Sequence, residues 1–275
     1  MLIVAADQRN GMKAVMDGAS AGPESVTAAD LAAAKTDLVR YLANFAPAIL
    51  LDPEVALPAI VDKDIISRET SLVVGMDASG FEVAEGLRYT RIVPGVSARR
   101  VRDLGGDAAK MLWYVRPDRQ GTGSRVADEM TELIDECERE GVLLIVELLT
   151  YQLDGESDAD YQSAFAALVA DGARLAVDCG AKVLKLQYPG SAEGCRAVTV
   201  AAAGVPWAVL SAGVDHATFL EQVATAMANG ASGAMAGRSL WKDSLSVSHE
   251  VRRDRLTTLA LPRLRELADV IDGQE

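Results

Sequence analysis

The stretch Gly180-Ala181-Lys182-Val183-Leu184-Lys185-Leu186-Gln187-Tyr188-Pro189 is a short apolar segment that ends at a proline. It follows a helical segment, residues 160–179, which stops at Gly180. The stretch is therefore predicted to be a buried strand that directly follows a helix. Seven similar apolar runs occur in the chain, at residues 2–6, 48–51, 72–76, 111–115, 142–149, 207–210 and 233–236.

Amphipathic helical segments lie between several of these runs. They cover residues 27–46, 124–140, 160–179 and 215–229, and a closing helix over 247–271 is interrupted near Pro262. Strands that alternate with helices are typical of parallel β/α folds, and a (β/α)8 barrel takes ~250 residues. We therefore predict an α/β fold in which residues 1–275 form a single (β/α)8 TIM barrel.

Composition narrows the function classes. A net charge of −13 argues against a nucleic acid or an anionic membrane as the main partner. No apolar run approaches the ~20 residues of a membrane span. The three cysteines lack metal spacing, so we expect reduced thiols in a cytoplasmic protein. With only His216 and His249, a histidine-rich metal site is not expected, although a carboxylate-only magnesium site stays open. We predict no metal and no cofactor.

Lys185 is the most informative side chain of the opening stretch. Alternation along a strand puts Val183, Lys185 and Gln187 on one face, which we expect to point into the barrel. Lys182 falls on the other face and is expected at the strand mouth. Burial lowers a lysine pKa from its usual ~10.4 towards values at which the free amine is nucleophilic, as a Schiff base requires. The alternative is a paired structural lysine.

Polar residues stand at the ends of six predicted strands. They are Asp7 and Gln8, Asp52, Glu147, Lys185, Ser211 and Gly213, and Gly237 and Arg238. Chemistry in parallel barrels collects at the carboxyl ends of the strands, and the loops after strands seven and eight commonly bind phosphate. Ser211, Gly213, Gly237 and Arg238 therefore indicate an anion site. Asp52 could equally cap a turn.

Lys110 is a second candidate for the barrel interior. Alternation puts Lys110, Leu112 and Tyr114 on one face, and it brings Glu147 to the interior as well. Two amines and one carboxylate can supply a nucleophile, a tuning cation and a proton shuttle, and we expect mutual repulsion to lower at least one amine pKa. A buried salt-bridge network is the alternative.

These residues and their surroundings resemble a known family. The matching segments are Ala-Asp7-Gln-Arg, Ile-Leu-Leu-Asp52-Pro-Glu-Val-Ala-Leu-Pro-Ala, Val-Glu147-Leu-Leu-Thr-Tyr, Val-Leu-Lys185, Leu-Ser211-Ala-Gly-Val-Asp and Gly-Ala-Ser-Gly-Ala-Met-Ala-Gly-Arg238-Ser-Leu-Trp. The chain is similar to class I tagatose-1,6-bisphosphate aldolases and sulfofructose-phosphate aldolases. The resemblance implies a metal-free lyase with Lys185 as Schiff-base lysine, Glu147 as acid/base and Lys110 as an active-site cation. It also implies substrate contacts from Asp7 and Gln8, and anion contacts from Ser211 and Arg238.

One departure from the family concerns Gln187, where relatives often carry a carboxylate. The expected reaction is reversible cleavage of a ketose 1-phosphate, such as tagatose 1,6-bisphosphate, into dihydroxyacetone phosphate and a three-carbon aldehyde. The alternatives are a sulfofructose 1-phosphate aldolase, a metal-dependent isomerase or epimerase, and a non-catalytic sugar-phosphate sensor. We expect a small phosphorylated or sulfonated ketose as partner, and a homo-oligomer.

Overall fold

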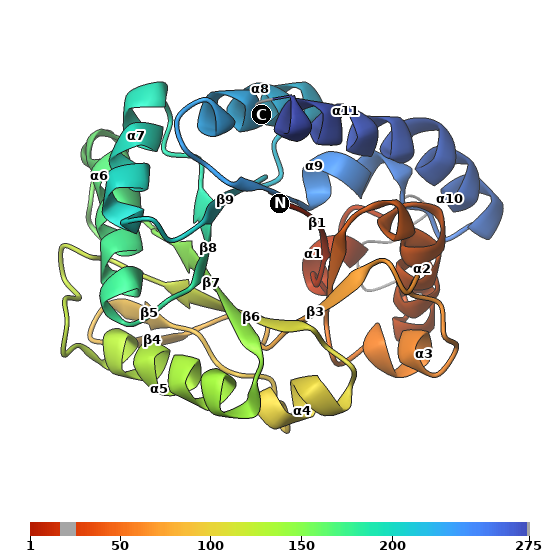
Figure 1. The fold of residues 1–275 in the computed structure, drawn as a ribbon, viewed down its shortest axis with the longest axis horizontal. Coiled ribbons are helices and arrows are strands. Elements are labelled where there is room, and N and C mark those ends of the chain that lie inside the picture. The colour runs from red at the N-terminus through yellow and green to blue at the C-terminus, as the bar shows by residue number, and fades with distance from the viewer. Residues whose placement is uncertain (17–25, 274–275) are drawn as a thin grey trace.

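A computed structural model of the chain describes residues 1–16 and 26–273. Eight parallel strands form a closed barrel in the order β1-β10-β9-β8-β7-β6-β3-β2, and helices surround it (Figure 1). The strands are β1 (Leu2–Ala6), β2 (Ala48–Leu51), β3 (Ser71–Gly75), β6 (Ala108–Tyr114), β7 (Leu143–Leu149), β8 (Val183–Gln187), β9 (Trp207–Leu210) and β10 (Gly233–Ala236). The predicted (β/α)8 barrel is confirmed.

The region between β3 and β6 holds two strands that the sequence pattern did not predict. β4 (Glu82–Ala84) and β5 (Leu87–Tyr89) form an antiparallel hairpin outside the barrel. Each strand has only three residues and Val83 is 62% exposed, so the hairpin lacks the buried apolar run by which the barrel strands were predicted. Arg125 ties the hairpin to the neighbouring helix, because its guanidinium pairs with Glu82 and lies over the ring of Tyr89.

The helices and helical turns follow the strands in chain order. They are α1 (Asn10–Lys13), α2 (Ala28–Tyr41), η2 (Ala43–Phe45), α3 (Leu57–Val61), α4 (Ala98–Asp103), α5 (Arg125–Glu140), α6 (Asp158–Asp178), α7 (Ala192–Ala202), α8 (His216–Met227), α9 (Arg238–Trp241), η3 (Lys242–Ser244), α10 (His249–Arg255), η4 (Leu256–Ala260) and α11 (Leu261–Asp272). Thr27 and Asp30 form a reciprocal capping box at α2. The expected interruption near Pro262 is the π-helical turn η4, since a proline has no N–H for the preceding turn. Within the described residues, no helix is long and apolar enough to cross a membrane.

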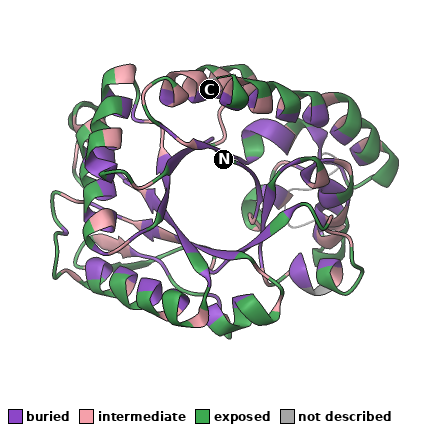
Figure 2. Cartoon of the chain, in the orientation of Figure 1, coloured by how far each residue is buried: buried purple, intermediate pink, exposed green. Residues whose placement is uncertain are grey.

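Alternation along the strands creates two apolar layers. One layer fills the space between the strands and the helices. The other lies inside the barrel, and its members are Ile3, Ala5, Ala48, Leu50, Val73, Ala108, Ile145, Val183, Ala208 and Met235. Figure 2 shows the strand ring as the buried part of the molecule, with exposed residues on the outer faces of the helices. The inner layer fills the lower part of the barrel interior. Inward side chains nearer the carboxyl ends of the strands therefore face the open end of the barrel.

The barrel closes between its first and last strands. Ile3 pairs with Met235 in the β1–β10 ladder, and Trp241 Nε1 donates a hydrogen bond of 2.9 Å to the carbonyl oxygen of Ala5. This closure brings the end of β1, with Asp7 and Gln8, beside the end of β10, with Gly237 and Arg238. Polar groups from both ends of the sequence therefore meet at one mouth.

Candidate active site

Lys185 and Glu147 form the centre of the candidate site. They occupy paired positions of the β7–β8 ladder, and the Nζ of Lys185 lies 2.9 Å from Oε2 of Glu147. Both side chains are almost fully buried, with residue exposures of 4% and 8%. The structure therefore places Lys185 inward, as the alternation predicts. Lys182 is on the surface at the opposite, amino end of β8, where it pairs with Glu138, so its expected position at the mouth was wrong.

Lys110 shares the same carboxylate. Its Nζ lies 3.0 Å from Oε2 of Glu147, and 2.6 Å from both Asp7 Oδ2 and Asp77 Oδ1. Burial alone would lower the pKa of Lys110, but the charges of the three carboxylates raise it well above its ordinary value. The repulsion expected between the two amines therefore does not lower the pKa of Lys110. The three carboxylates thus stabilise the ammonium form of Lys110.

The carboxylates around Lys110 respond in opposite ways. Burial would raise the pKa of Asp7, but the nearby ammonium groups of Lys110 and Lys185 lower it well below the ordinary value. Burial raises the pKa of Asp77, and repulsion from Asp7 and Glu147 adds to the effect despite the contact with Lys110. Asp7 thus stays ionised, and its Oδ1 is a buried acceptor without a hydrogen-bond partner in the described part of the chain.

Asp77 is the site residue that the sequence reasoning missed. It stands two residues after the end of β3, as a strand-end carboxylate comparable to Asp7 after β1. That position was a usable signal, but Asp77 begins the arginine-rich segment that carries no strand pattern. A Cβ built on Gly75 would lie 3.4 Å from the Cβ of Asp7, so the end of β3 lies directly beside the cluster.

A cavity of about 250 Å³ opens beside Lys185 and Glu147. Its wall is formed by residues of β1 and β7 to β10 and of the segments that directly follow these strands: Ala5, Gln8, Glu147, Leu149, Lys185, Gln187, Leu210, Ser211, Ala212, Gly213, Met235, Gly237 and Arg238. Seven of the ten predicted site residues line this cavity. Two more lie beneath it, where Lys110 contacts Glu147 and Asp7 contacts Lys110. A larger groove of about 400 Å³ lies between α5 and β6 and contains none of them.

Donors gather at the β9–β10 side of the cavity. Ser211 Oγ accepts a hydrogen bond of 3.3 Å from the backbone N–H of Gly237, which leaves its hydroxyl proton free to donate. Gly213 has a φ of +86°, and a Cβ there would lie 3.1 Å from the guanidinium carbon of Arg238. Arg238 therefore rests directly on Gly213. A hydroxyl, a guanidinium and backbone N–H groups are the donors that a phosphate needs.

Gln8 and Asp52 differ in their positions. Gln8 lines the cavity, with its Oε1 buried and without a hydrogen-bond partner among the described residues. Asp52 is fully buried outside the cavity, where it forms an ion pair with Lys35 and accepts hydrogen bonds from the backbone N–H groups of Glu54 and Val55. The structure therefore gives Asp52 the turn-capping role that the sequence left open.

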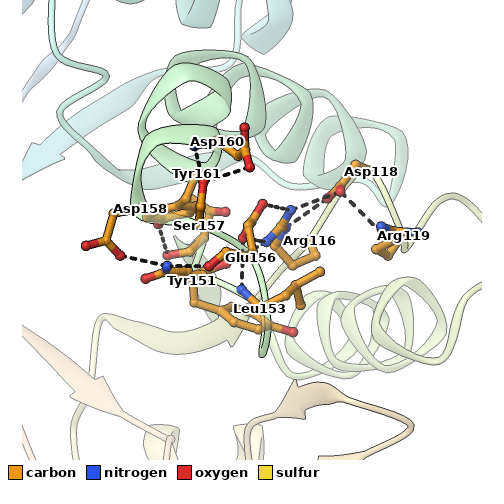
Figure 3. Close-up of polar contacts among 12 residues, drawn as sticks. Arg116, Asp118, Arg119, Tyr151, Leu153, Glu156, Ser157, Asp158, Asp160 and Tyr161 are labelled. Carbon is orange, nitrogen blue, oxygen red and sulfur yellow. Dashed lines mark hydrogen bonds and ion pairs between the residues drawn. The ribbon is translucent and has the colours of Figure 1, made fainter.

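The loop that follows β7 is held by a polar network (Figure 3). The buried guanidinium of Arg116 binds the carboxylates of Asp118 and Glu156 and donates to the carbonyl oxygen of Tyr151 at 3.0 Å. The hydroxyl of Tyr161 donates to the carbonyl oxygen of Thr150 at 3.1 Å. Because these bonds anchor both carbonyls, the loop has a fixed course at the edge of the cavity.

In the described residues, no group of three His, Cys, Asp or Glu side chains is arranged to hold a metal ion. The three carboxylates of the cluster instead surround the ammonium of Lys110.

Comparison with known proteins gives consistent matches. A family model described as DeoC/LacD family aldolase matches residues 1–243. The tagatose 1,6-diphosphate aldolase 2 of Streptococcus mutans serotype c is 28% identical over 297 residues, which covers 98% of this chain and 89% of that protein. The tagatose 1,6-diphosphate aldolase of Staphylococcus epidermidis is 26% identical, with 98% and 90% covered. An archaeal fructose 1,6-bisphosphate aldolase shares the fold, with a TM-score of 0.64, 20% identity and coverage of 99% and 93%.

Proposed function

Because the chain belongs to the DeoC/LacD aldolase family, we propose that it is a class I aldolase, a lyase that forms a Schiff base through Lys185. The resemblance noted in the sequence is thereby confirmed for the family. The observation that carries the mechanism is the position of one carboxylate oxygen of Glu147 between two lysine amines, at 2.9 Å from Lys185 and 3.0 Å from Lys110.

The first stage is formation of the iminium. Lys185 must give up a proton before its amine can attack a ketose C2 carbonyl, and Glu147 Oε2 is within hydrogen-bond distance to receive it. The amine adds to C2 to give a carbinolamine, which loses water to give the iminium. The same carboxyl group can return the proton to the departing hydroxyl. Lys110 is disfavoured as the nucleophile, because three carboxylates hold its ammonium group and raise its pKa.

The second stage is cleavage of the C3–C4 bond. The bonding electrons pass to the iminium nitrogen to give an enamine, while the C4 hydroxyl loses its proton and the aldehyde departs. Glu147 is the proposed base for that proton, directly or through water. Asp7 is the proposed acceptor for a substrate hydroxyl, since its Oδ1 has no partner among the described residues and its lowered pKa keeps it ionised. Protonation of the enamine at C3 and hydrolysis then release the ketone product.

The substrate that we propose is a ketose 1-phosphate such as tagatose 1,6-bisphosphate, which would yield dihydroxyacetone phosphate and a three-carbon aldehyde phosphate. The names of the two bacterial relatives support this choice. The donors at Ser211, Gly213 and Arg238 suit the C1 phosphate, while the N–H of Gly237 orients the hydroxyl of Ser211, and Gln8 would contact the same end of the substrate. We further propose a cytoplasmic homo-oligomer; the three buried, free cysteines fit a reducing compartment.

Reductive trapping tests the mechanism. Borohydride added with tagatose 1,6-bisphosphate should give a covalent adduct that peptide mass spectrometry locates on Lys185. Lys185→Met should abolish both the adduct and the activity. Lys182→Met is the matched control, because Lys182 lies on the same strand but on the surface, paired with Glu138. An adduct on another residue, or activity retained in Lys185→Met, would overturn the proposal.

The choice of substrate needs a separate assay. Tagatose 1,6-bisphosphate, fructose 1,6-bisphosphate and sulfofructose 1-phosphate compared at equal concentration would rank the candidates by kcat/KM. Highest kcat/KM for the sulfonated ketose would replace the proposed substrate without changing the chemistry. Tight binding of all three without cleavage would instead indicate a sensor.

A further inference from the structure

Gln187 lines the cavity, but no step of the proposed reaction uses its side chain. It is the last residue of β8, two positions beyond Lys185 on the same face of the strand, and it lines the cavity. Its backbone pairs with Leu210 of β9, the residue that precedes Ser211. Gln187 therefore stands between the amine that would bind C2 of the substrate and the donors that would bind its C1 phosphate.

The orientation of the Gln187 amide is determined by a backbone contact. Its Oε1 accepts a hydrogen bond of 2.8 Å from the backbone N–H of Thr150. A backbone N–H can only donate, so the atom facing Thr150 must be the oxygen, and Nε2 must take the other position. Nε2 has no hydrogen-bond partner among the described residues. Two amide protons are therefore available to a ligand.

The support beneath this contact is rigid. Thr150 is held through its own carbonyl by the hydroxyl of Tyr161, and the next carbonyl, of Tyr151, is held by the buried Arg116 (Figure 3). Arg116 in turn binds Glu156 at 2.6 Å and 2.9 Å through two nitrogens. A side chain that is fixed at one end by such a frame presents its free end with little loss of entropy on binding.

The charges of the neighbouring groups identify the ligand. Ser211 and Arg238 present donors on the same side of the cavity, and Arg238 forms no ion pair within the described part of the chain. An anion bound there would lie one strand away from Gln187. We propose that Nε2 of Gln187 donates a hydrogen bond to the C1 phosphate of the substrate and completes this anion site; the inference rests on the proposed function.

A carboxylate at the same position would act in the opposite sense. Glutamate could still accept the hydrogen bond of Thr150, so the loop contact would survive. It would, however, offer no donor when ionised, and it would bring a negative charge towards the phosphate. The amide at position 187 thus favours binding of the anion, and the comparison of two substitutions separates the lost donor from the added charge.

The experiment uses Gln187→Met and Gln187→Glu with inorganic phosphate as probe, measured by calorimetry on the intact enzyme and by competition against substrate. Loss of a hydrogen bond to a charged group should weaken phosphate binding about tenfold in Gln187→Met. Gln187→Glu should weaken it further at neutral pH and recover part of the loss on acidification, because protonation removes the charge and restores a donor. Thermal unfolding of both variants checks that the fold is retained.

Substrates with and without the C1 phosphate separate binding from a merely structural role. Gln187→Met should lower kcat/KM for tagatose 1,6-bisphosphate about tenfold and leave kcat/KM for tagatose 6-phosphate unchanged. Equal losses on both substrates, or unchanged phosphate binding in both variants, would overturn the inference. Absence of any Lys185 adduct in the wild type would overturn the proposed function instead, and the calorimetric comparison would still decide the role of Gln187.

Discussion

Glu147 Oε2 lies 2.9 Å from Lys185 Nζ, across a pair of residues that face each other in the β7–β8 ladder. Because both backbones are fixed by the barrel, the two side chains meet without a mobile loop between them. A proton can therefore pass between the nucleophile and its base with no change in the fold.

Replacement of Glu147 by glutamine should impair catalysis far more than binding. The amide keeps the size of the side chain but cannot accept the proton of Lys185, so kcat should fall by about 100- to 10,000-fold. Steady-state kinetics and borohydride trapping measure the effect. Glu138→Gln is the control, because Glu138 is a surface residue that pairs with Lys182. A kcat within the experimental error of wild type in Glu147→Gln would contradict the assignment.

Replacement of Lys110 by methionine should destabilise the fold in a pH-dependent way. Asp7, Asp77 and Glu147 would lose their shared cation, and breaking a buried ion pair costs about 3–5 kcal/mol. The folded pKa of Asp7 is lowered from 3.8, so its stabilising contribution is present above that value and is lost as the pH falls through the folded pKa.

The free energy of unfolding of Lys110→Met should therefore differ most from wild type at neutral pH, and the gap should narrow as the pH drops below 4 and the carboxylates are protonated. Urea titrations at several pH values measure this. A gap that stays constant or widens towards acid would show that Lys110 does not act through the carboxylates.

Replacement of Asp52 by asparagine should affect stability and not substrate binding. Asparagine still accepts the N–H bonds of Glu54 and Val55, but it leaves Lys35 buried without a counter-charge, at a cost of about 3–5 kcal/mol. The double variant Lys35→Met/Asp52→Asn should recover part of the loss. If Asp52→Asn raised the KM for the ketose phosphate while its unfolding curve stayed that of wild type, Asp52 would have to be counted as a substrate contact.

Replacement of Gly213 by alanine should weaken the anion site. A residue with a Cβ at positive φ costs about 1–2 kcal/mol, and this Cβ would also press on the guanidinium of Arg238 at 3.1 Å. We expect the KM for phosphorylated ketoses to rise about tenfold as the donor is displaced. Gly190→Ala is the matched control, since Gly190 has a φ of +91° with no atom within 4 Å of the added Cβ. Gly190→Ala should lower stability without changing KM. An equal rise in KM in both variants would show that displacement of Arg238 is not the cause.

Much of this site follows from the sequence because strand alternation is a local property. The two-residue period separated Lys185 from Lys182, and it placed Lys110 and Glu147 in the interior before any tertiary contact was known. Asp77 was missed although it directly follows the predicted run 72–76, because it also begins the arginine-rich segment and was assigned to that segment. The pairing of Lys35 with Asp52 was also beyond sequence reasoning, since a lysine on a helix is ordinarily exposed and its burial depends on how α2 packs against the strands.

The pKa of Lys110 is a second property that could not be predicted from the sequence. Two lysines in one interior suggest repulsion, but Asp7 after β1, Asp77 after β3 and Glu147 within β7 outweigh it at Lys110. The sign of such a shift depends on distances of a few ångströms, which no spacing in the chain encodes.

The seam between β1 and β10 has a consequence for folding. The bond from Trp241 to Ala5 joins residues 236 positions apart. Closure of the seam therefore carries a loop-closure entropy cost that spans nearly the whole chain. Gln8 reaches Gly237 only once the seam has formed. A partly folded chain with an open seam would thus hold Lys185 and the donors after β9 and β10 without Gln8, and the complete site should appear only when the seam closes.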